Sequence, residues 1–210
     1  MRNRVIVAVV TAAGLFCATS CSGSSTAGTP SPAQQTSATQ SSVPAKLIPP
    51  YGGAPKVTNP LPDSVLSGSP CDALTPEQVK VNLGAEETGK LDRLAGIGPQ
   101  CTWSNLDTGG QINVFFSTED HLGLSGAYAN SRPRMKTFKE LPPIQGLPAV
   151  AYSPKAGPTP DHCEVTVGIT DTLSVDIAVS LSIAKSGKVD ACSIVPDTAN
   201  DVITTLKQKA

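Results

Sequence analysis

The sequence CEVTVGI at residues 163–169, followed by LSVDIAVS at residues 173–180, decides the fold. Apolar residues recur at every second position in both stretches, and this period predicts strands whose side chains alternate between two faces. Asp171 and Thr172 lie between the stretches, where a turn is expected. The sequence therefore predicts a β-hairpin with one apolar face covered by other elements and one polar face in contact with water.

Further strands are expected before this hairpin. Residues 100–104 and 111–116 alternate in the same way, and Asp107-Thr108-Gly109-Gly110 between them is typical of a turn. Residues 148–152 predict another strand, and a loop rich in Pro and Gly follows at residues 153–161. Because short turns can join only antiparallel neighbours, these strands predict an antiparallel sheet.

A short helix is expected ahead of the strands. Thr75 can cap it, Pro76 suits its first position, and Gln78 completes a capping box. Gly84 is expected to end this helix, because glycine readily adopts the left-handed conformation that follows a last turn. A second short helix is expected within residues 124–130.

The chain is expected to end in a longer helix. Its apolar residues follow the three-four spacing of one buried stripe: Ile194, Val195, Ala199, Val202, Ile203 and Leu206. Pro196 lies within this pattern, so the helix either begins there or bends there. Together the elements predict an α+β fold, in which an antiparallel β-sheet is packed by a short N-terminal helix and a C-terminal helix.

The first 20 residues have the layout of a secretory signal peptide. Arg2 and Arg4 form a basic start, and an apolar run of about a dozen residues follows at residues 5–16. A spanning helix needs roughly 20 apolar residues, so this run is too short for a stable transmembrane anchor. Small residues at positions 18–20 then lead to Cys21.

Cys21 is the predicted lipidation site. Small residues before a cysteine are typical of a bacterial lipobox, whose cysteine sulfur is acylated and whose chain is cut on the N-terminal side of that cysteine. Two acyl chains, such as palmitate, anchor a protein stably where one is marginal. The alternative is ordinary cleavage near Ser20, which would leave Cys21 as a free thiol. Cys17 is a poorer candidate because the bulky Leu15 and Phe16 precede it.

Composition divides the rest of the chain. Residues 21–68 are expected to be a disordered linker, because their Ser, Thr, Pro and Gly cannot bury enough apolar surface to offset chain entropy. Residues 69–210 are expected to form a single globular domain.

Cleavage after residue 20 lowers Lys plus Arg from 16 to 14 against 17 Asp plus Glu, a net charge of −3. This balance argues against nucleic-acid binding, which needs a basic face.

Four cysteines lie in the expected domain: Cys71, Cys101, Cys163 and Cys192. An even number in an exported chain predicts two disulfides, for which three pairings are possible. We favour Cys71–Cys101 and Cys163–Cys192, since each closes a loop of about 30 residues and contributes ~3.5 kcal/mol. The competing interpretation is a four-cysteine zinc site, but such sites usually contain closely spaced cysteine pairs.

Patterns for catalysis or metal binding are weak. The two histidines occur as Asp120-His121 and Asp161-His162, in segments expected to be exposed turns. No Gly-x-Ser-x-Gly motif is present, and the spacing does not predict a shared metal site. Gly96-Ile97-Gly98 lacks the lysine of a phosphate-binding loop. Three aromatic residues are more typical of a core than of a pocket: Trp103, Phe115 and Phe116.

Four segments carry a resemblance to a known family: residues 70–75 (PCDALT), 101–103 (CTW), 163–165 (CEV) and 190–192 (DAC). Their spacing resembles that of actinobacterial lipoproteins of the LprB/LprC type, a domain of unknown function. The likeness covers roughly residues 68–208. It implies a cell-envelope lipoprotein on the outer face of the cytoplasmic membrane, and it implies no specific activity.

The sequence therefore predicts a non-catalytic binding or interaction module, lipid-anchored on the extracytoplasmic face of the cell membrane. We expect no cofactor and no metal. We expect a monomer that binds an envelope protein or a lipid or glycolipid ligand. The alternative is a minor envelope hydrolase with a site assembled around Asp120/His121 or Asp161/His162. A fold that brings these pairs into one cleft would favour the enzyme.

Overall fold

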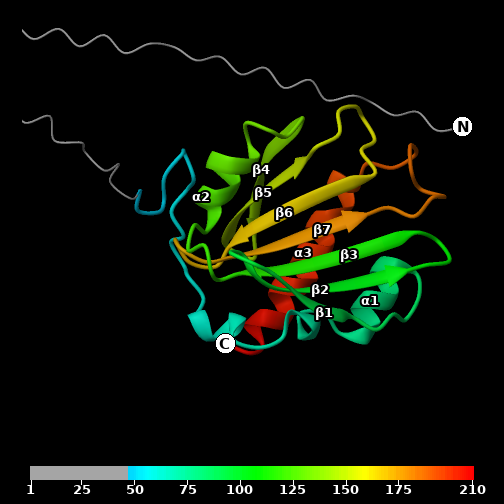
Figure 1. Cartoon of the computed structure of the whole chain (residues 1–210), viewed down its shortest axis with the longest axis horizontal. Helices are drawn as coiled ribbons and strands as arrows, with labels where there is room; N and C mark the ends of the chain where they lie inside the picture. The colour runs from blue at the N-terminus through cyan, green and yellow to red at the C-terminus, as the bar shows by residue number, and fades with distance from the viewer. Residues whose placement is uncertain (1–46) are drawn as a thin grey trace, which may run out of the picture. The chain divides into compact units, whose positions relative to one another are not determined.

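The structure is a computed structural model that describes residues 47–210. One seven-stranded sheet has the strand order β1-β2-β3-β7-β6-β5-β4, and all neighbouring strands are antiparallel (Figure 1). The strands are β1 (Lys90–Leu94), β2 (Gly98–Asn105), β3 (Gly110–Ser117), β4 (Thr137–Ile144), β5 (Leu147–Ser153), β6 (His162–Gly168) and β7 (Ser174–Ser180). The expected antiparallel sheet is confirmed.

The hairpin that decides the fold is β6–β7, and it lies in the middle of the sheet. Val165 is paired with Ile177, and Thr166 is paired with Asp176. Directly paired residues of antiparallel strands point to the same face. The apolar side chains of the hairpin therefore share one face of the sheet, and its polar side chains share the other.

Both edge strands are absent from the sequence prediction. β1 has the sequence KLDRL and is exposed along its whole length, so it has no buried face to impose alternation. β4 contains Pro142 and Pro143, which argue against a central strand. An edge strand tolerates charges and prolines, because one of its sides makes no ladder hydrogen bonds.

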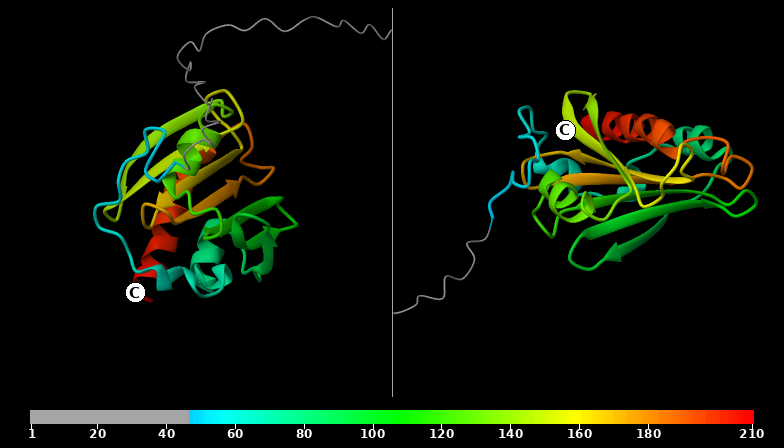
Figure 2. Two further views of the ribbon diagram at one scale, coloured as in Figure 1. Left: turned by 60° about the vertical axis from the view of Figure 1, so that its left-hand side comes forward. Right: turned by 90° about the horizontal axis from the view of Figure 1, so that it is seen from above.

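The C-terminal helix α3 (Ala191–Lys207) covers one face of the sheet (Figures 1 and 2). Its buried stripe includes Val195, Ala199 and Val202, all without exposed surface. The side chain of Asp190 caps the helix by accepting a hydrogen bond from the Cys192 N–H at 2.8 Å. The predicted helix is confirmed, and it starts before Pro196 rather than at it.

The short helix α1 (Pro76–Leu83) has the capping box expected from the sequence, and Gly84 follows it with φ 77°. Polar contacts connect it to α3. The Thr198 hydroxyl donates to Asn82 Oδ1 at 2.6 Å, and Asn82 Nδ2 donates to Asp201 at 3.1 Å. These bonds fix α1 beside the C-terminal helix.

Both favoured disulfides are present. Cys71–Cys101 joins the short helix η2 (Pro70–Asp72) to β2, and Cys163–Cys192 joins β6 to the first turn of α3. The Cα atoms of the two pairs are 5.0 and 5.1 Å apart, within the usual range for disulfides. The second bond holds α3 directly against the central hairpin.

The opposite face of the sheet is covered only in part. The one-turn helix α2 (Leu124–Gly126) continues into η3 (Ala127–Ser131), a π-helical turn, where the sequence predicts an ordinary short helix. Tyr128 of η3 packs edge-on against Phe138 of β4, with ring centroids 5.2 Å apart. Phe138 in turn stacks on Tyr152 of β5. A small second core therefore lies over the β4–β5 side of the sheet.

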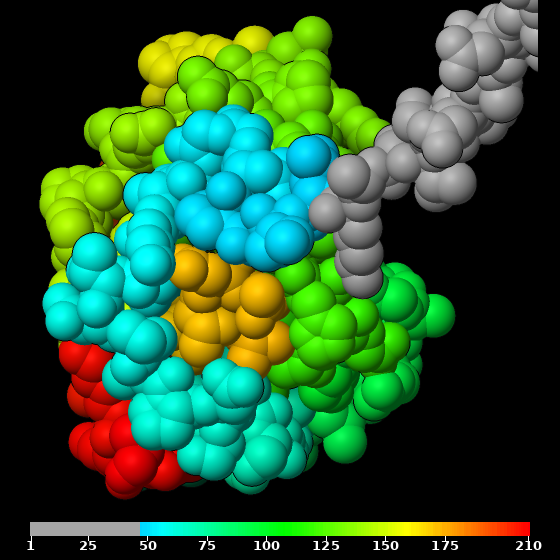
Figure 3. All heavy atoms as spheres, turned by 90° about the vertical axis from the view of Figure 1, so that its left-hand side faces the viewer, coloured from blue at the N-terminus to red at the C-terminus, as the bar shows by residue number. Residues whose placement is uncertain are grey.

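The structure corrects the predicted boundary between linker and domain at residue 68. Residues 47–68 lie on the domain, and Val57, Val65 and Leu66 are buried in the main core. The backbone N–H of Val57 donates to Asp171 at 2.8 Å, and that of Tyr51 donates to the Ser125 hydroxyl at 2.9 Å. Figure 3 shows this segment in blue and cyan around the orange turn that joins β6 and β7. A few apolar residues were enough to fix a stretch whose average composition predicts disorder.

The predicted signal peptide, the linker up to residue 46 and the lipidation site at Cys21 lie outside the described residues. Within residues 47–210, no helix has the length and apolar character needed to span a bilayer.

Candidate ligand-binding site

The sheet face that α3 does not cover carries a row of polar side chains on adjacent strands. Tyr152 of β5 is paired with Glu164 of β6. Thr166 of β6 is paired with Asp176 of β7, which is paired in turn with Phe115 of β3. The pairing places all of these side chains on the same face.

A cavity of about 280 Å³ opens on this face. The sheet forms its floor, and α2, η3 and the β1–β2 turn form its walls. Three carboxyl groups line it, from Asp120, Glu164 and Asp176. Hydroxyl groups contribute further polar surface: Ser117, Ser131, Tyr152, Thr166 and Ser174. Its apolar wall includes Leu94, Ile97, Phe115 and Ala127. A concave site with an apolar wall and a few convergent polar groups is typical of small-molecule binding.

Asp176 lies at the centre of the polar floor. The hydroxyls of Ser117 and Thr166 each donate a hydrogen bond to one of its two carboxylate oxygens. Burial raises the pKa of Asp176, although these hydrogen bonds act in the opposite direction. Both of its oxygens are therefore already engaged by the protein.

Glu164 differs from Asp176 in having a free oxygen. Its Oε1 accepts a hydrogen bond from the Tyr152 hydroxyl at 2.5 Å. Its Oε2 has no hydrogen-bond partner within residues 47–210, although Glu164 lines the cavity. Burial, and then the neighbouring charge of Asp176, raise the pKa of Glu164 to about 7.

The cavity has a second notable wall, the π-helical turn η3. Ala127, Asn130 and Ser131 all belong to this turn and all line the cavity. π-Helical turns are rare and are frequent at functional sites, because they widen a helix and redirect its side chains. The local geometry therefore points to the same place as the polar floor.

Comparison with known proteins identifies the family. A family model described as a protein of unknown function (DUF3558) matches residues 16–205. The chain belongs to the DUF3558 family. No curated protein and no solved structure matches the chain.

In this DUF3558 protein, the predicted Asp120-His121 pair is split between two places. Asp120 lines the cavity, and its Oδ1 accepts a hydrogen bond from the Leu122 N–H at 3.1 Å. His121 instead lines a separate pocket beside Asp63 and Thr172. One member of the pair therefore belongs to the candidate site, and the other does not.

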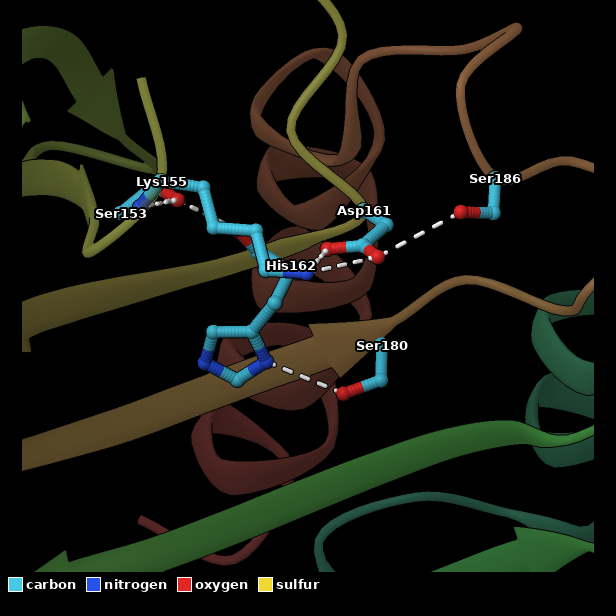
Figure 4. Close-up of polar contacts among 6 residues, drawn as sticks. All are labelled: Ser153, Lys155, Asp161, His162, Ser180 and Ser186. Atoms are coloured by element: carbon cyan, nitrogen blue, oxygen red, sulfur yellow. Dashed lines mark hydrogen bonds and ion pairs between the residues drawn. The ribbon is translucent and has the colours of Figure 1, made fainter.

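The predicted Asp161-His162 pair lies at the far end of the same strands (Figure 4). Asp161 forms an ion pair with Lys155 at 2.6 Å, and His162 Nδ1 lies 3.0 Å from the Ser180 hydroxyl. His162 and Ser180 are paired at one end of β6–β7, whereas Asp120 follows the other end of the adjacent β3. Six residues of strand separate the two ends, or roughly 20 Å. The two acidic-histidine pairs therefore do not meet in this protein.

Most of the remaining candidates from the sequence lie in turns or in the core. Gly96 and Ile97 belong to the β1–β2 turn, and the Ile97 carbonyl accepts hydrogen bonds from two backbone N–H groups. Trp103 and Phe116 are buried in the main core, whereas Phe115 lines the cavity. Within residues 47–210, no group of three or more His, Cys, Asp or Glu side chains is placed to hold a metal ion.

Sequence reasoning missed the residues that form the floor. Glu164, Thr166 and Asp176 stand on the polar side of the alternating hairpin, and that side was expected only to face water. The available signal was the presence of two acidic residues on adjacent strands of one face, without a basic residue between them. What the sequence could not supply was the cover that α2 and η3 place over them.

Proposed function

We propose that this protein is a lipid-anchored, non-catalytic binding protein of the cell envelope, similar to the LprB/LprC-type lipoproteins. Its ligand would bind in the cavity on the open face of the sheet. The observation that carries the proposal is the cavity itself, which combines an apolar wall with a polar floor that includes one unpaired carboxylate oxygen. Envelope lipids, glycolipids and a segment of an envelope protein are the ligand classes that such a protein meets.

The proposed anchor rests on the sequence. A basic start, a short apolar run and small residues precede Cys21. The family match begins at residue 16, so it covers the small residues and Cys21 but not the basic start. Two disulfides in the described domain fit an oxidising compartment outside the cytosol. Acylation of Cys21 would hold the domain at the extracytoplasmic face of the cell membrane, where we propose that it acts as a monomer.

A non-catalytic role is proposed because the histidines are placed outside the cavity. His162 bonds to Ser180 at the far end of the strands, and His121 lines another pocket. A triad needs a nucleophile, a base and an orienting group within hydrogen-bond reach of one another. Neither predicted pair forms such an arrangement with a serine in the cavity.

The anchor is tested by mass spectrometry of the full-length protein extracted from membranes. The expected result is a mature chain that begins at Cys21 and carries a diacylglycerol adduct. A Cys21→Ser variant should leave the membrane fraction. An unmodified mature N-terminus would contradict the anchor without affecting the cavity.

The binding role is tested by native mass spectrometry of the same protein with an envelope extract. Ser131→Trp places a bulky ring at the cavity wall and should abolish capture of the ligand. Ser186→Trp is a matched control, because Ser186 is exposed in the loop beside Asp161. Equal capture by both variants would show that the cavity is not the binding site.

A further inference from the structure

This inference rests on the binding function proposed above and names the chemical class of the ligand. We propose that the cavity takes a small organic cation, whose ammonium group binds the free carboxylate oxygen of Glu164 and whose apolar body lies against the β1–β2 turn.

The charge of the cavity is the first argument. Asp120, Glu164 and Asp176 line it, and among the described residues that line it none is basic. A charge removed from water is costly unless an opposite charge accompanies it. The cavity therefore lacks the counter-charge that its carboxyl groups require, and a cationic ligand would supply it.

The basic residues near the cavity are engaged elsewhere. Arg93 forms an ion pair with Glu119, outside the cavity. The Arg132 guanidinium lies over the rings of Tyr128 and Phe138, 5.8 and 5.5 Å from their centroids. Neither side chain lines the cavity, so the protein does not neutralise its own acidic floor.

On the sheet floor of the cavity, hydrogen bonding distinguishes Glu164 from Asp176 as the contact. Asp176 already accepts from Ser117 and Thr166 through both of its oxygens. Glu164 accepts only from Tyr152 and keeps its second oxygen free. An ammonium group carries three donors and no acceptor, which suits a site that offers acceptors. Tyr152 fixes the carboxylate, and the free oxygen remains available to the ligand.

The apolar wall indicates the chemistry of the part of the ligand beyond its ammonium group. Leu94, Ile97 and Phe115 line one side of the cavity. A hydrophobic body attached to the ammonium group would cover these side chains, and the face of an aromatic ring attracts cations. The volume of about 280 Å³ lies just below the usual range for small-molecule sites, which begins at about 300 Å³, and it therefore favours a compact amine.

Protonation of Glu164 is coupled to the binding. The titratable groups that act on it are Asp176 from β7 and Tyr152 from β5. Asp120, from the loop after β3, lines the same cavity and acts on Asp176, whereas α2 and η3 contribute no titratable group to the cavity. Because the pKa of Glu164 is about 7, the carboxyl group is largely neutral in mild acid. A cation binds the ionised form, so its binding would release a proton near neutral pH.

The test uses the full-length protein and three probes of the same shape: benzylamine, benzyl alcohol and benzoate. Ligand-observed NMR titrations at pH 5.5 and pH 8 give the affinities. Benzylamine should bind roughly 30-fold more tightly at pH 8, in proportion to the ionised fraction of a group with a pKa of about 7. The neutral and anionic probes should bind at least about tenfold more weakly than benzylamine at pH 8.

A matched pair of variants locates the effect. Glu164→Gln should remove the preference for benzylamine and its pH dependence. Glu140→Gln should change neither. Glu140 accepts a hydrogen bond from the Tyr128 hydroxyl at 3.0 Å, as Glu164 does from Tyr152, but it lies outside the cavity. Thermal unfolding of both variants shows that they are folded. Calorimetry at pH 7 in phosphate and in Tris buffer measures the proton released.

The outcomes separate this inference from the proposed function. Equal binding of the three probes, or benzylamine binding that survives Glu164→Gln, would overturn the cationic ligand. If the envelope extract yields a neutral or anionic ligand that Ser131→Trp excludes, the cavity function stands and the cationic ligand is wrong. If the extract yields no ligand but Glu164-dependent benzylamine binding is found, the site is cation-selective and the proposed envelope ligand is wrong.

Discussion

The two faces of the sheet differ in how their side chains are satisfied. On the face covered by α3, Val165 and Ile177 of the sheet pack with Val202 of α3 in the main apolar core, and none of the three has exposed surface. On the other face, Glu164 and Asp176 are enclosed beneath α2 and η3, and their environment disfavours the charged form. The first face is optimised for burial, and the second retains groups that are costly to enclose.

The contrast teaches where function is to be sought in this molecule. Apolar burial stabilises the fold by roughly 25 cal/mol per Å² of surface removed from water. Enclosed carboxyl groups reduce that stability, and a fold keeps them where a ligand compensates for the cost. The functional site is therefore expected on the less stable face, and four measurements can test this division.

The largest loss of stability is expected for a substitution on the face that α3 covers. Ile177→Ala removes a fully buried side chain between β7 and α3 and should lower the free energy of unfolding by about 4 kcal/mol. Urea denaturation of the wild type and the variant measures the difference. A loss below about 1 kcal/mol would show that this face repacks freely and is not the rigid half of the domain.

The next effect concerns the bond that holds α3 on that face. Replacing Cys163 and Cys192 together by alanine should cost about 3.5 kcal/mol, because the unfolded chain regains the freedom of a 29-residue loop. The matched pair Cys71→Ala with Cys101→Ala opens a loop of similar length and should cost about as much. Unchanged denaturation midpoints would contradict the entropic contribution of both bonds.

The third measurement concerns the open face, where the substitution should raise the stability at high pH instead of lowering it. The pKa of Glu164 is raised in the folded state, so its contribution to stability is greatest below the unfolded pKa near 4.5 and is lost as the pH rises through about 7. Glu164→Gln should therefore make the protein more stable at pH 8 by up to about 3 kcal/mol and change little at pH 4.5.

Denaturation at the two pH values measures this gain. Glu140→Gln is the control, since Glu140 is exposed and lies outside the cavity. Any pH dependence that remains in Glu164→Gln is expected from Asp176, whose pKa is raised as well. A Glu164→Gln variant that is less stable than the wild type at pH 8 would show that the carboxylate is already neutralised by the protein.

The smallest effect is expected on the open face outside the cavity. The Thr102 hydroxyl donates to Asn113 at 2.6 Å across β2 and β3. Thr102→Val removes this partly exposed bond and should cost about 1 kcal/mol or less, with no pH dependence. Urea denaturation at pH 5 and pH 8 checks both points. A large pH-dependent loss of stability would show that groups with shifted pKa values also lie outside the cavity.

The sequence predicted the elements that alternation and spacing define. The β6–β7 hairpin, α3 and the two disulfides follow from local patterns, because the buried face of each imposes a period on the residues. β1 and β4 were missed because an edge strand needs no such period. Their charged and proline-containing sequences protect an edge rather than fill a core.

The cavity could not be predicted for a different reason. Polar residues such as Glu164 have the same pattern whether they face water or a pocket. The distinction depends on α2 and η3, which lie about forty residues upstream in the sequence, and on the register that pairs Tyr152 with Glu164. The burial of three apolar side chains within residues 47–68 was missed likewise, since Val57, Val65 and Leu66 do not alter the average composition of that segment.

The first described residues of the chain have a mechanical consequence. Tyr51 bonds to Ser125, and the backbone of Gly52 lies against Ala129 and Tyr128, so the chain meets the domain at the wall of the cavity. A pulling force applied through the N-terminus would act first on α2 and η3, and only later on the sheet and α3. Tension would thus disturb the wall of the cavity before the protein unravelled.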